Sequence, residues 1–143
     1  MNLKDRILFR SAQRVLSRNM EFAGRHAGES CYLFGNGASI KHYDLGKFND
    51  RIGIGCNNLF FHKDFLGLDI RYYYTGHPFL YYPYWRNPYS NKFEKNVLGS
   101  LYRKKIILSQ HVTYFMSLGD YMSIRQPNIY YCHHFGQLFT GYS

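Results

Sequence analysis

The sequence lacks several features that would have narrowed its class. It has three cysteines in 143 residues, Cys31, Cys56 and Cys132, and none of them forms a CxxC pair. Widely spaced cysteines in apolar stretches are typical of buried, reduced thiols in a cytosolic protein. The chain also lacks a secretory leader and any apolar run long enough to cross a bilayer. We therefore expect a cytoplasmic protein. Peripheral contact with the inner membrane is compatible with that location.

Acidic residues are scarce as well. Nine Asp and Glu stand against 18 Lys and Arg, which gives a net charge of +9. Such an excess indicates an anionic partner: nucleic acid, an acidic membrane surface or a phosphorylated ligand. The excess is concentrated at the start of the chain, because residues 1–28 carry six basic and two acidic side chains.

Residues 2–23 predict an amphipathic helix that Gly24 and Gly28 end. Arginines recur every four residues along one side, and an apolar face lies elsewhere on the helix. The apolar face comprises Leu8, Phe9, Ala12, Val15, Leu16 and Met20. One interpretation is a surface helix that packs on the domain. The other is a helix that rests on an anionic membrane, through residues 1–25, near lipid-linked acceptors. Residues 1–28 form the first of two expected regions.

The second expected region, residues 29–143, is rich in aromatic side chains. Aromatic residues make up 20% of the chain and hydrophobic residues 45%, enough for a core, and the length fits one domain of ordinary size. Fifteen of the residues are tyrosines. Because the tyrosine hydroxyl needs a hydrogen-bond partner, we expect many of them near the surface or in a polar cleft.

Short apolar runs in this region alternate with turns or helical segments, and several runs are almost continuously apolar, as in parallel strands covered on both faces. The pattern predicts an α/β fold with a Rossmann-like, open, mostly parallel sheet. No helix follows the last run, so we expect the sheet to be incomplete at the C-terminus. The expected strands are 30–35, 51–57, 68–76, 104–110 and 128–134, with a short helix or turn region at 38–48.

A glycine turn, Gly35-Asn36-Gly37, follows the first expected strand. It is either a cradle for a phosphate or ribose, helped by a following helix N-terminus, or a plain strand-to-helix connection. It does not complete the dinucleotide fingerprint, because the third glycine position holds Ile40. The second strand ends in the amides Asn57 and Asn58 where that fingerprint expects a carboxylate. NAD is therefore disfavoured. The two strand ends should be neighbours at one edge of the sheet.

Three stretches resemble a known family in order and spacing: LFGNGASIKHYDL, IGIGCNNLFF and RYYYTGHP. Together they are similar to the N-terminal half of the bacterial sialyltransferases of glycosyltransferase family 42. They are also similar to a related group of uncharacterised or pterin-pyrophosphokinase-like domains from surface-polysaccharide and flagellin-modification loci. The resemblance covers roughly residues 30–80, and Ala38 and Ile40 depart mildly from the family motif.

The resemblance implies a domain that binds a CMP-sugar as donor substrate, with no other cofactor and no metal, and a glycan or lipid-linked acceptor. By position, Asn36 and Gly37 would contact the phosphate or ribose and Asn57 the cytidine. His77 stands where the family has an asparagine near the donor. The complete set of expected nucleotide-binding residues is Gly35, Asn36, Gly37, Ser39, Asn57, Asn58, His77, Thr140 and Gly141.

Several alternatives stay open beside this interpretation. The lone His77 can equally be structural, and Thr140-Gly141 can simply cap a helix. A metal at Cys132, His133 and His134 is disfavoured, because adjacent histidines on a strand point to opposite faces. The family's catalytic histidine lies beyond the position of Ser143, so no general base is assigned and we expect this chain alone to be inactive.

Two other classes of protein compete with the glycosyltransferase. A pterin-pyrophosphokinase-like domain would need Mg²⁺ held by carboxylates near the phosphates. A nucleic-acid-binding module would use the basic and aromatic residues, but no RNP-like or helix-turn-helix signature is present, so this class is disfavoured.

Overall fold

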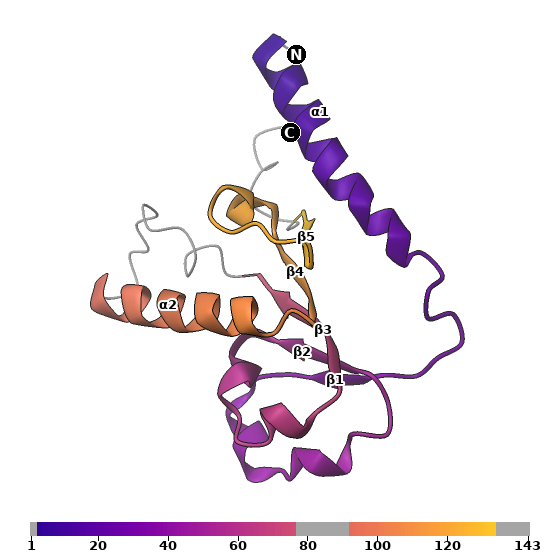
Figure 1. Cartoon of the computed structure of the whole chain (residues 1–143), viewed down its shortest axis with the longest axis vertical. Coiled ribbons are helices and arrows are strands. Elements are labelled where there is room, and N and C mark those ends of the chain that lie inside the picture. Colours follow the sequence, from indigo (N-terminus) through magenta and orange to yellow (C-terminus); the bar gives the residue numbers. More distant parts are fainter. Residues whose placement is uncertain (1–2, 77–91, 134–143) are drawn as a thin grey trace, which may run out of the picture.

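The computed structural model describes residues 3–76 and 92–133 (Figure 1). The chain begins with helix α1 (Leu3–Ser17), which continues as the 3-10 helix η1 (Arg18–Phe22). The strands are β1 (Tyr32–Phe34), β2 (Gly53–Cys56), β3 (Ile70–Thr75), β4 (Thr113–Ser117) and β5 (Ile129–Cys132), and helix α2 (Lys92–Leu108) precedes β4. Short 3-10 helices fill most other connections: η2 (Ala38–His42), η3 (Leu45–Lys47), η4 (Asn57–Phe61), η5 (Phe65–Gly67) and η7 (Leu118–Met122). Within the described ranges, no helix combines the length and apolarity needed to cross a membrane.

All five strands form one parallel sheet in the order β1-β2-β3-β4-β5. The predicted open, parallel α/β sheet with an N-terminal helix is therefore confirmed. The order simply follows the chain. Doubly wound folds bind their ligand in the crevice where the strand order reverses, and among these five strands the order does not reverse. Right-handed crossovers that always advance the same way fall on one face. In agreement with this, buried residues of the described helices η4, η5 and α2 pack on one side of the sheet.

That side of the sheet holds the core. Successive strand residues point to opposite faces, and the buried ones alternate in β2, β4 and β5. Tyr73, Tyr114 and Ile129 lie side by side in register on neighbouring strands, and each is fully buried. Tyr102 and Ile106 of α2 belong to the same cluster of buried residues. Figure 1 shows α2 lying across this face.

The opposite face is covered by the chain that follows α1. The Phe22 ring makes edge contacts with Tyr72, Phe115 and Tyr130 of three adjacent strands, at centroid distances of 5.9, 5.2 and 4.7 Å. Tyr72 and Tyr73 are consecutive, so Phe22 and α2 lie on opposite faces.

The same N-terminal segment also protects an edge of the sheet. Arg18 Nη2 donates to the carbonyl of Pro127 at 3.0 Å, and Asn19 Nδ2 donates to the carbonyl of Tyr131 at 2.9 Å. Tyr131 belongs to β5, the last strand in the sheet order. An edge strand exposes unpaired backbone groups that invite association with other chains. The two side chains satisfy part of this edge and tie η1 to it.

The predicted fourth strand, residues 104–110, is wrong. Residues 104–108 are the last turns of α2, and the strand is Thr113–Ser117. The reason is visible in the spacing of the buried residues. Tyr102 and Ile106 are buried four residues apart, whereas Ile107 and Leu108 are 48% and 70% exposed, as expected on a helix. The other four predicted strands are found, each shorter than predicted, and the 38–48 region contains the short helices η2 and η3.

One expectation about side-chain burial is corrected. Cys31 is exposed, because it precedes the edge strand β1, and Cys56 and Cys132 are half-buried; all three are free thiols. Many of the described tyrosines lie near the surface, as expected: Tyr43 is exposed, and Tyr32, Tyr72, Tyr74, Tyr121 and Tyr130 are half-buried. Others belong to the core. Tyr73, Tyr102, Tyr114 and Tyr131 are buried in the core, and all but Tyr114 have a hydroxyl hydrogen bond there.

Strand β2 carries two glycines because rings from its neighbours occupy the space beside it. A Cβ added at Gly55 would lie 2.7 Å from the Tyr73 ring and 2.9 Å from Leu59. A Cβ at Gly53 would lie 2.7 Å from Ile70 and 3.0 Å from the Phe34 ring. Real Cβ atoms do not approach so closely, so both positions require glycine for the packing of the core.

We expect Gly55→Ala to lower the free energy of unfolding by about 2 kcal/mol, since the added methyl group forces the Tyr73 ring to move. Gly67→Ala is the matched control, because nothing lies within 4 Å of a Cβ at Gly67. Urea denaturation of both variants measures the difference. Equal stability of the two variants would contradict the close packing at Gly55.

Candidate functional site

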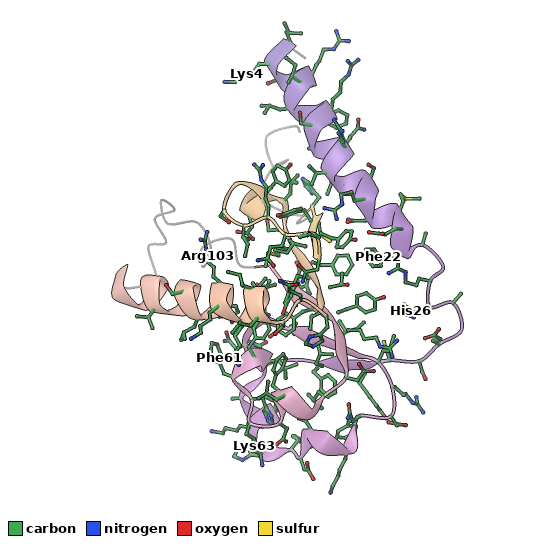
Figure 2. All side chains as sticks on the ribbon, in the orientation of Figure 1. Lys4, Phe22, His26, Phe61, Lys63 and Arg103 are labelled. Atoms are coloured by element: carbon green, nitrogen blue, oxygen red, sulfur yellow. The ribbon has the colours of Figure 1, made fainter. Side chains whose placement is uncertain are left out.

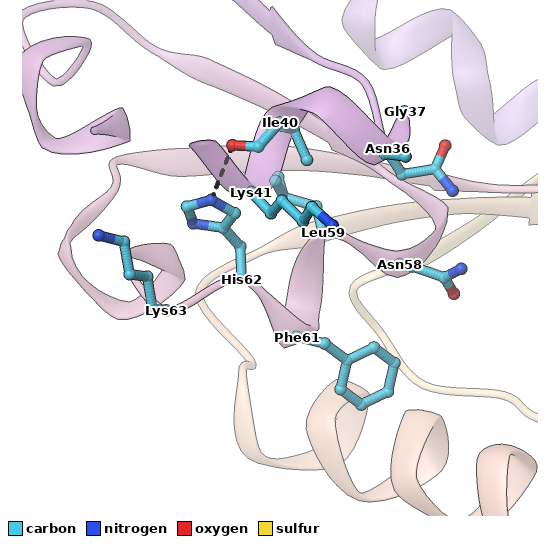
Figure 3. A pocket seen from close by; sticks show the side chains of 10 residues that line it. Asn36, Gly37, Ile40, Lys41, Asn58, Leu59, Phe61, His62 and Lys63 are labelled. Atoms are coloured by element: carbon cyan, nitrogen blue, oxygen red, sulfur yellow. Dashed lines mark hydrogen bonds between the residues drawn. The ribbon is translucent and has the colours of Figure 1, made fainter. Parts of the chain in front are cut away.

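The glycine turn and the asparagine pair lie at one edge of the sheet, after β1 and β2 respectively. Because these strands are parallel neighbours, their carboxyl ends meet. Between them lies a cavity of about 410 Å³ (Figure 3). It is lined by Asn36, Gly37, Ala38, Ile40, Lys41, Asn58, Leu59, Phe61, His62 and Lys63. Its volume is within the range of small-molecule sites, roughly 300–1,000 Å³.

The turn after β2 is held in place by one tyrosine of β3. The Tyr73 hydroxyl donates to the Asn57 carbonyl at 2.7 Å and accepts from the Phe60 N–H at 3.1 Å. The Tyr73 ring stacks on Phe60 with 3.9 Å between centroids. Asn57 has a φ of 48°, a left-handed conformation that asparagine tolerates better than most residues. The Asn57 side chain is absent from the lining of this cavity, and the backbone carbonyl of Asn57 holds the turn through Tyr73.

Asn58 is the member of the pair that lines the cavity. Its Oδ1 accepts a hydrogen bond from the hydroxyl of Tyr102 on α2. Burial raises the pKa of Tyr102 to about 12, so this hydroxyl stays protonated and remains a donor at neutral pH. With Oδ1 engaged, the Asn58 amide presents its NH₂ group as a donor. In Figure 3, Asn36 and Asn58 extend toward the same end of the cavity.

Two lysines give the cavity a positive potential. Lys41 follows the glycine turn in η2, Lys63 follows η4, and both are exposed. In Figure 3 the Lys41 amine extends toward the two asparagine amides, whereas Lys63 lies at the opposite end. The helix after the glycine turn has only five residues and is of the 3-10 type. The expected contribution of a helix N-terminus to anion binding is therefore small, and the lysines are the cationic groups at the cavity.

His62 also lines the cavity, but both of its ring nitrogens have partners. Nδ1 accepts from the Asp64 N–H at 3.2 Å, so it carries no proton, and Nε2–H donates to the Ile40 carbonyl at 3.1 Å. The His62 side chain is 5% exposed. These bonds connect the turn after β2 to the turn after β1. They make His62 a structural link between the two turns.

The remaining expected site residues have other positions. Gly35 and Ser39 line a neighbouring cavity of about 340 Å³, which shares Gly37 and Ile40 with the first and is walled by Tyr32, Tyr43 and Phe48 among others. His77, Thr140 and Gly141 lie outside the described residues. The structure thus brings Asn36, Gly37 and Asn58 together, with Gly35 and Ser39 beside them.

Sequence reasoning missed Lys41, Phe61, Lys63 and Tyr102. The first three lie within a few residues of the glycine turn or the asparagine pair. Their closeness in the sequence to these motifs could have identified them as candidates. No local signal identified Tyr102, because it comes from α2, a helix whose end was predicted as a strand.

Asp120 is a further residue that the sequence did not single out. It lies in η7 after β4, at the carboxyl edge of the sheet, roughly 10 Å from β2 at a strand spacing of about 4.8 Å. Its side chain is fully buried, and in the part of the chain that the structure describes neither carboxylate oxygen has a hydrogen-bond partner. Burial raises the pKa of this carboxyl to about 7. Buried carboxyls with such a raised pKa gather at functional sites, which makes Asp120 a candidate.

Within residues 3–76 and 92–133, no three side chains of His, Cys, Asp or Glu are arranged to hold a metal ion. Comparison of the chain with family models, with curated proteins and with solved structures finds no match.

Asp120 makes stability depend on pH in a defined direction. Its pKa is higher in the folded protein, about 7, than in the unfolded chain, about 4. The folded state therefore binds the proton more tightly, and stability falls as the pH rises between these two values. At about 1.4 kcal/mol per pKa unit, the advantage of Asp120→Asn over the parent chain should grow by about 3 kcal/mol from pH 5 to pH 8.

Urea denaturation of both proteins across this pH range measures the effect, and the parent chain serves as the control for every other titrating group. A stability difference between the two proteins that stays constant with pH would contradict the raised pKa of Asp120.

Proposed function

We propose that the chain is the donor-nucleotide-binding part of a sialyltransferase-like glycosyltransferase that uses a CMP-sugar. The observation that carries this proposal is the cavity at the ends of β1 and β2, where Asn36, Gly37 and Asn58 meet beside Lys41. The stretches that resemble glycosyltransferase family 42 include all four of these residues. The fold supplies the parallel α/β frame that such a domain would have.

Each group in the cavity suits one part of a cytidine nucleotide. The Asn36 amide can both donate and accept, and the Asn58 amide can donate through its NH₂ group, so the two can pair with a base edge or with ribose hydroxyls. The Phe61 ring is 47% exposed and offers a surface for stacking. Gly37 allows a close approach of the backbone, and the Lys41 amine is a cation for the phosphate.

The proposed reaction moves a sugar from its nucleotide to a hydroxyl of a glycan or lipid-linked acceptor. A bond forms between the acceptor oxygen and the anomeric carbon, the bond to the CMP phosphate breaks, and a base takes the hydroxyl proton. No Asp or Glu lines the described cavity, and both ring nitrogens of His62 are engaged in hydrogen bonds within the protein. The cavity therefore supports donor binding, and we expect no turnover by this chain alone. The three free cysteines suit a cytoplasmic setting.

Isothermal titration calorimetry with CMP and with cytidine tests the proposal. We expect Lys41→Gln to weaken CMP binding about tenfold, the loss of one charge-assisted hydrogen bond, and to leave cytidine binding unchanged. Lys47→Gln is the matched control, since Lys47 is exposed in η3 and lines neither cavity. It should keep the CMP affinity of the parent chain.

The same titrations with other ligands separate the competing classes. Tighter binding of NAD than of CMP would overturn the donor proposal. Binding of ATP that requires Mg²⁺ would favour the pterin-pyrophosphokinase-like class instead. A strong, salt-sensitive affinity for generic single-stranded oligonucleotides, with none for CMP, would favour a nucleic-acid-binding module.

A further inference from the structure

Among the described residues, helix α1 is attached to the sheet near its C-terminal end. Val15 packs against the core, and the Arg18 and Asn19 side chains that follow α1 bind carbonyls at β5. No residue of α1 is buried, and every residue from 3 to 11 is exposed. In Figure 2, Lys4 marks the distant end of α1, and Phe22 lies against the sheet beyond its other end. We call residues 3–11 the free arm.

The free arm exposes large apolar side chains. The exposed fractions are 73% for Leu3, 57% for Ile7, 60% for Leu8 and 51% for Phe9. Leu8 also continues a stripe at helical spacing through Ala12 to Val15, the residue that packs on the core. The stripe is covered at its C-terminal end and open along the free arm. Four large apolar side chains among nine residues are more than the scattered exposure of an ordinary surface.

The free arm is also basic. It carries Lys4, Arg6 and Arg10 with Asp5 as its one acidic residue, and Arg14 continues the row one turn further on. Long basic side chains can lie along an apolar surface while their charged ends reach toward anionic groups. The free arm therefore presents an apolar surface and a cationic surface together.

We infer that the free arm docks on an anionic lipid surface. Apolar side chains gain from burial at the boundary between headgroups and acyl chains, and cations gain from anionic headgroups. Nucleic acid would match the cations but would leave the apolar side chains in water. A second copy of the chain would bring two proteins of net charge +9 together. A membrane is the partner that matches both properties.

The attachment at β5 restricts which residues take part in this contact. Arg18 lies over the Tyr130 ring at 4.6 Å, and Phe22 packs on the sheet. The sequence predicted membrane contact through residues 1–25. In the structure only the first half of this segment is available for lipid contact, and the second half anchors the free arm to the domain. The inference is independent of nucleotide binding at the cavity.

Cosedimentation of the full chain with vesicles tests the inference. We expect binding to vesicles of equal parts phosphatidylglycerol and phosphatidylcholine, no binding to pure phosphatidylcholine, and loss of binding on raising salt from 0.1 to 0.5 M. Arg6→Gln with Arg10→Gln should weaken binding about tenfold, and Ile7→Ser with Leu8→Ser should do the same. Because every residue of the free arm is exposed, neither pair should change the midpoint of thermal unfolding.

The matched control is Lys47→Gln with Lys104→Gln, which removes the same charge at two exposed positions outside α1. It should bind vesicles within twofold of the parent chain. The inference is overturned if the control loses as much binding as the arginine pair, or if neutral vesicles bind equally well. It is also overturned if light scattering shows a dimer that the serine pair dissociates while vesicles are not bound.

Discussion

The packing and hydrogen bonding of Tyr73 hold the described site together. The ring of Tyr73 fits beside β2 only because Gly55 has no side chain, and it stacks on Phe60 of the turn that follows β2. The hydroxyl then bonds both ends of that turn, the carbonyl of Asn57 and the N–H of Phe60. A buried backbone group without a partner is costly, so this one side chain determines the shape of the turn. The position of Asn58 in the cavity follows from that shape.

The same use of tyrosine recurs across the core and explains the composition of the chain. Tyr102 fills the space between α2 and the sheet and ends in a hydrogen bond to Asn58. Tyr131 fills the space under η7 and ends in a hydrogen bond to the Ile124 carbonyl. Each ring supplies apolar area, and each hydroxyl satisfies a polar group at a turn. The connections between strands are short 3-10 helices with few internal bonds, so tyrosines from the sheet and from α2 help to hold them.

The sequence predicted the parallel sheet because four strands are apolar runs bounded by glycine, asparagine or proline. It did not predict β4, because the apolar residues 106–108 resemble part of a strand. Only the burial of Tyr102 and Ile106, four residues apart, shows that this run belongs to a helix. The sequence also predicted that the glycine turn and Asn58 are neighbours, because the carboxyl ends of two adjacent parallel strands lie at the same edge of the sheet. The roles of Asn57, Tyr102 and Asp120 did not follow, since a positive φ, a contact from α2 and complete burial arise from tertiary packing rather than from any local pattern.

The net charge of +9 divides between structural and available cations. Arg18, Arg103 and Arg125 donate to backbone carbonyls of Pro127, Ser123 and Tyr121, so these guanidinium groups hold the fold around β5 and η7. Lys41 and Lys63 flank the cavity, and the free arm of α1 carries a separate group of basic residues. Each group faces a different environment. Total charge therefore indicates no single partner, and the most informative cations are those next to apolar or amide groups that a particular ligand would need.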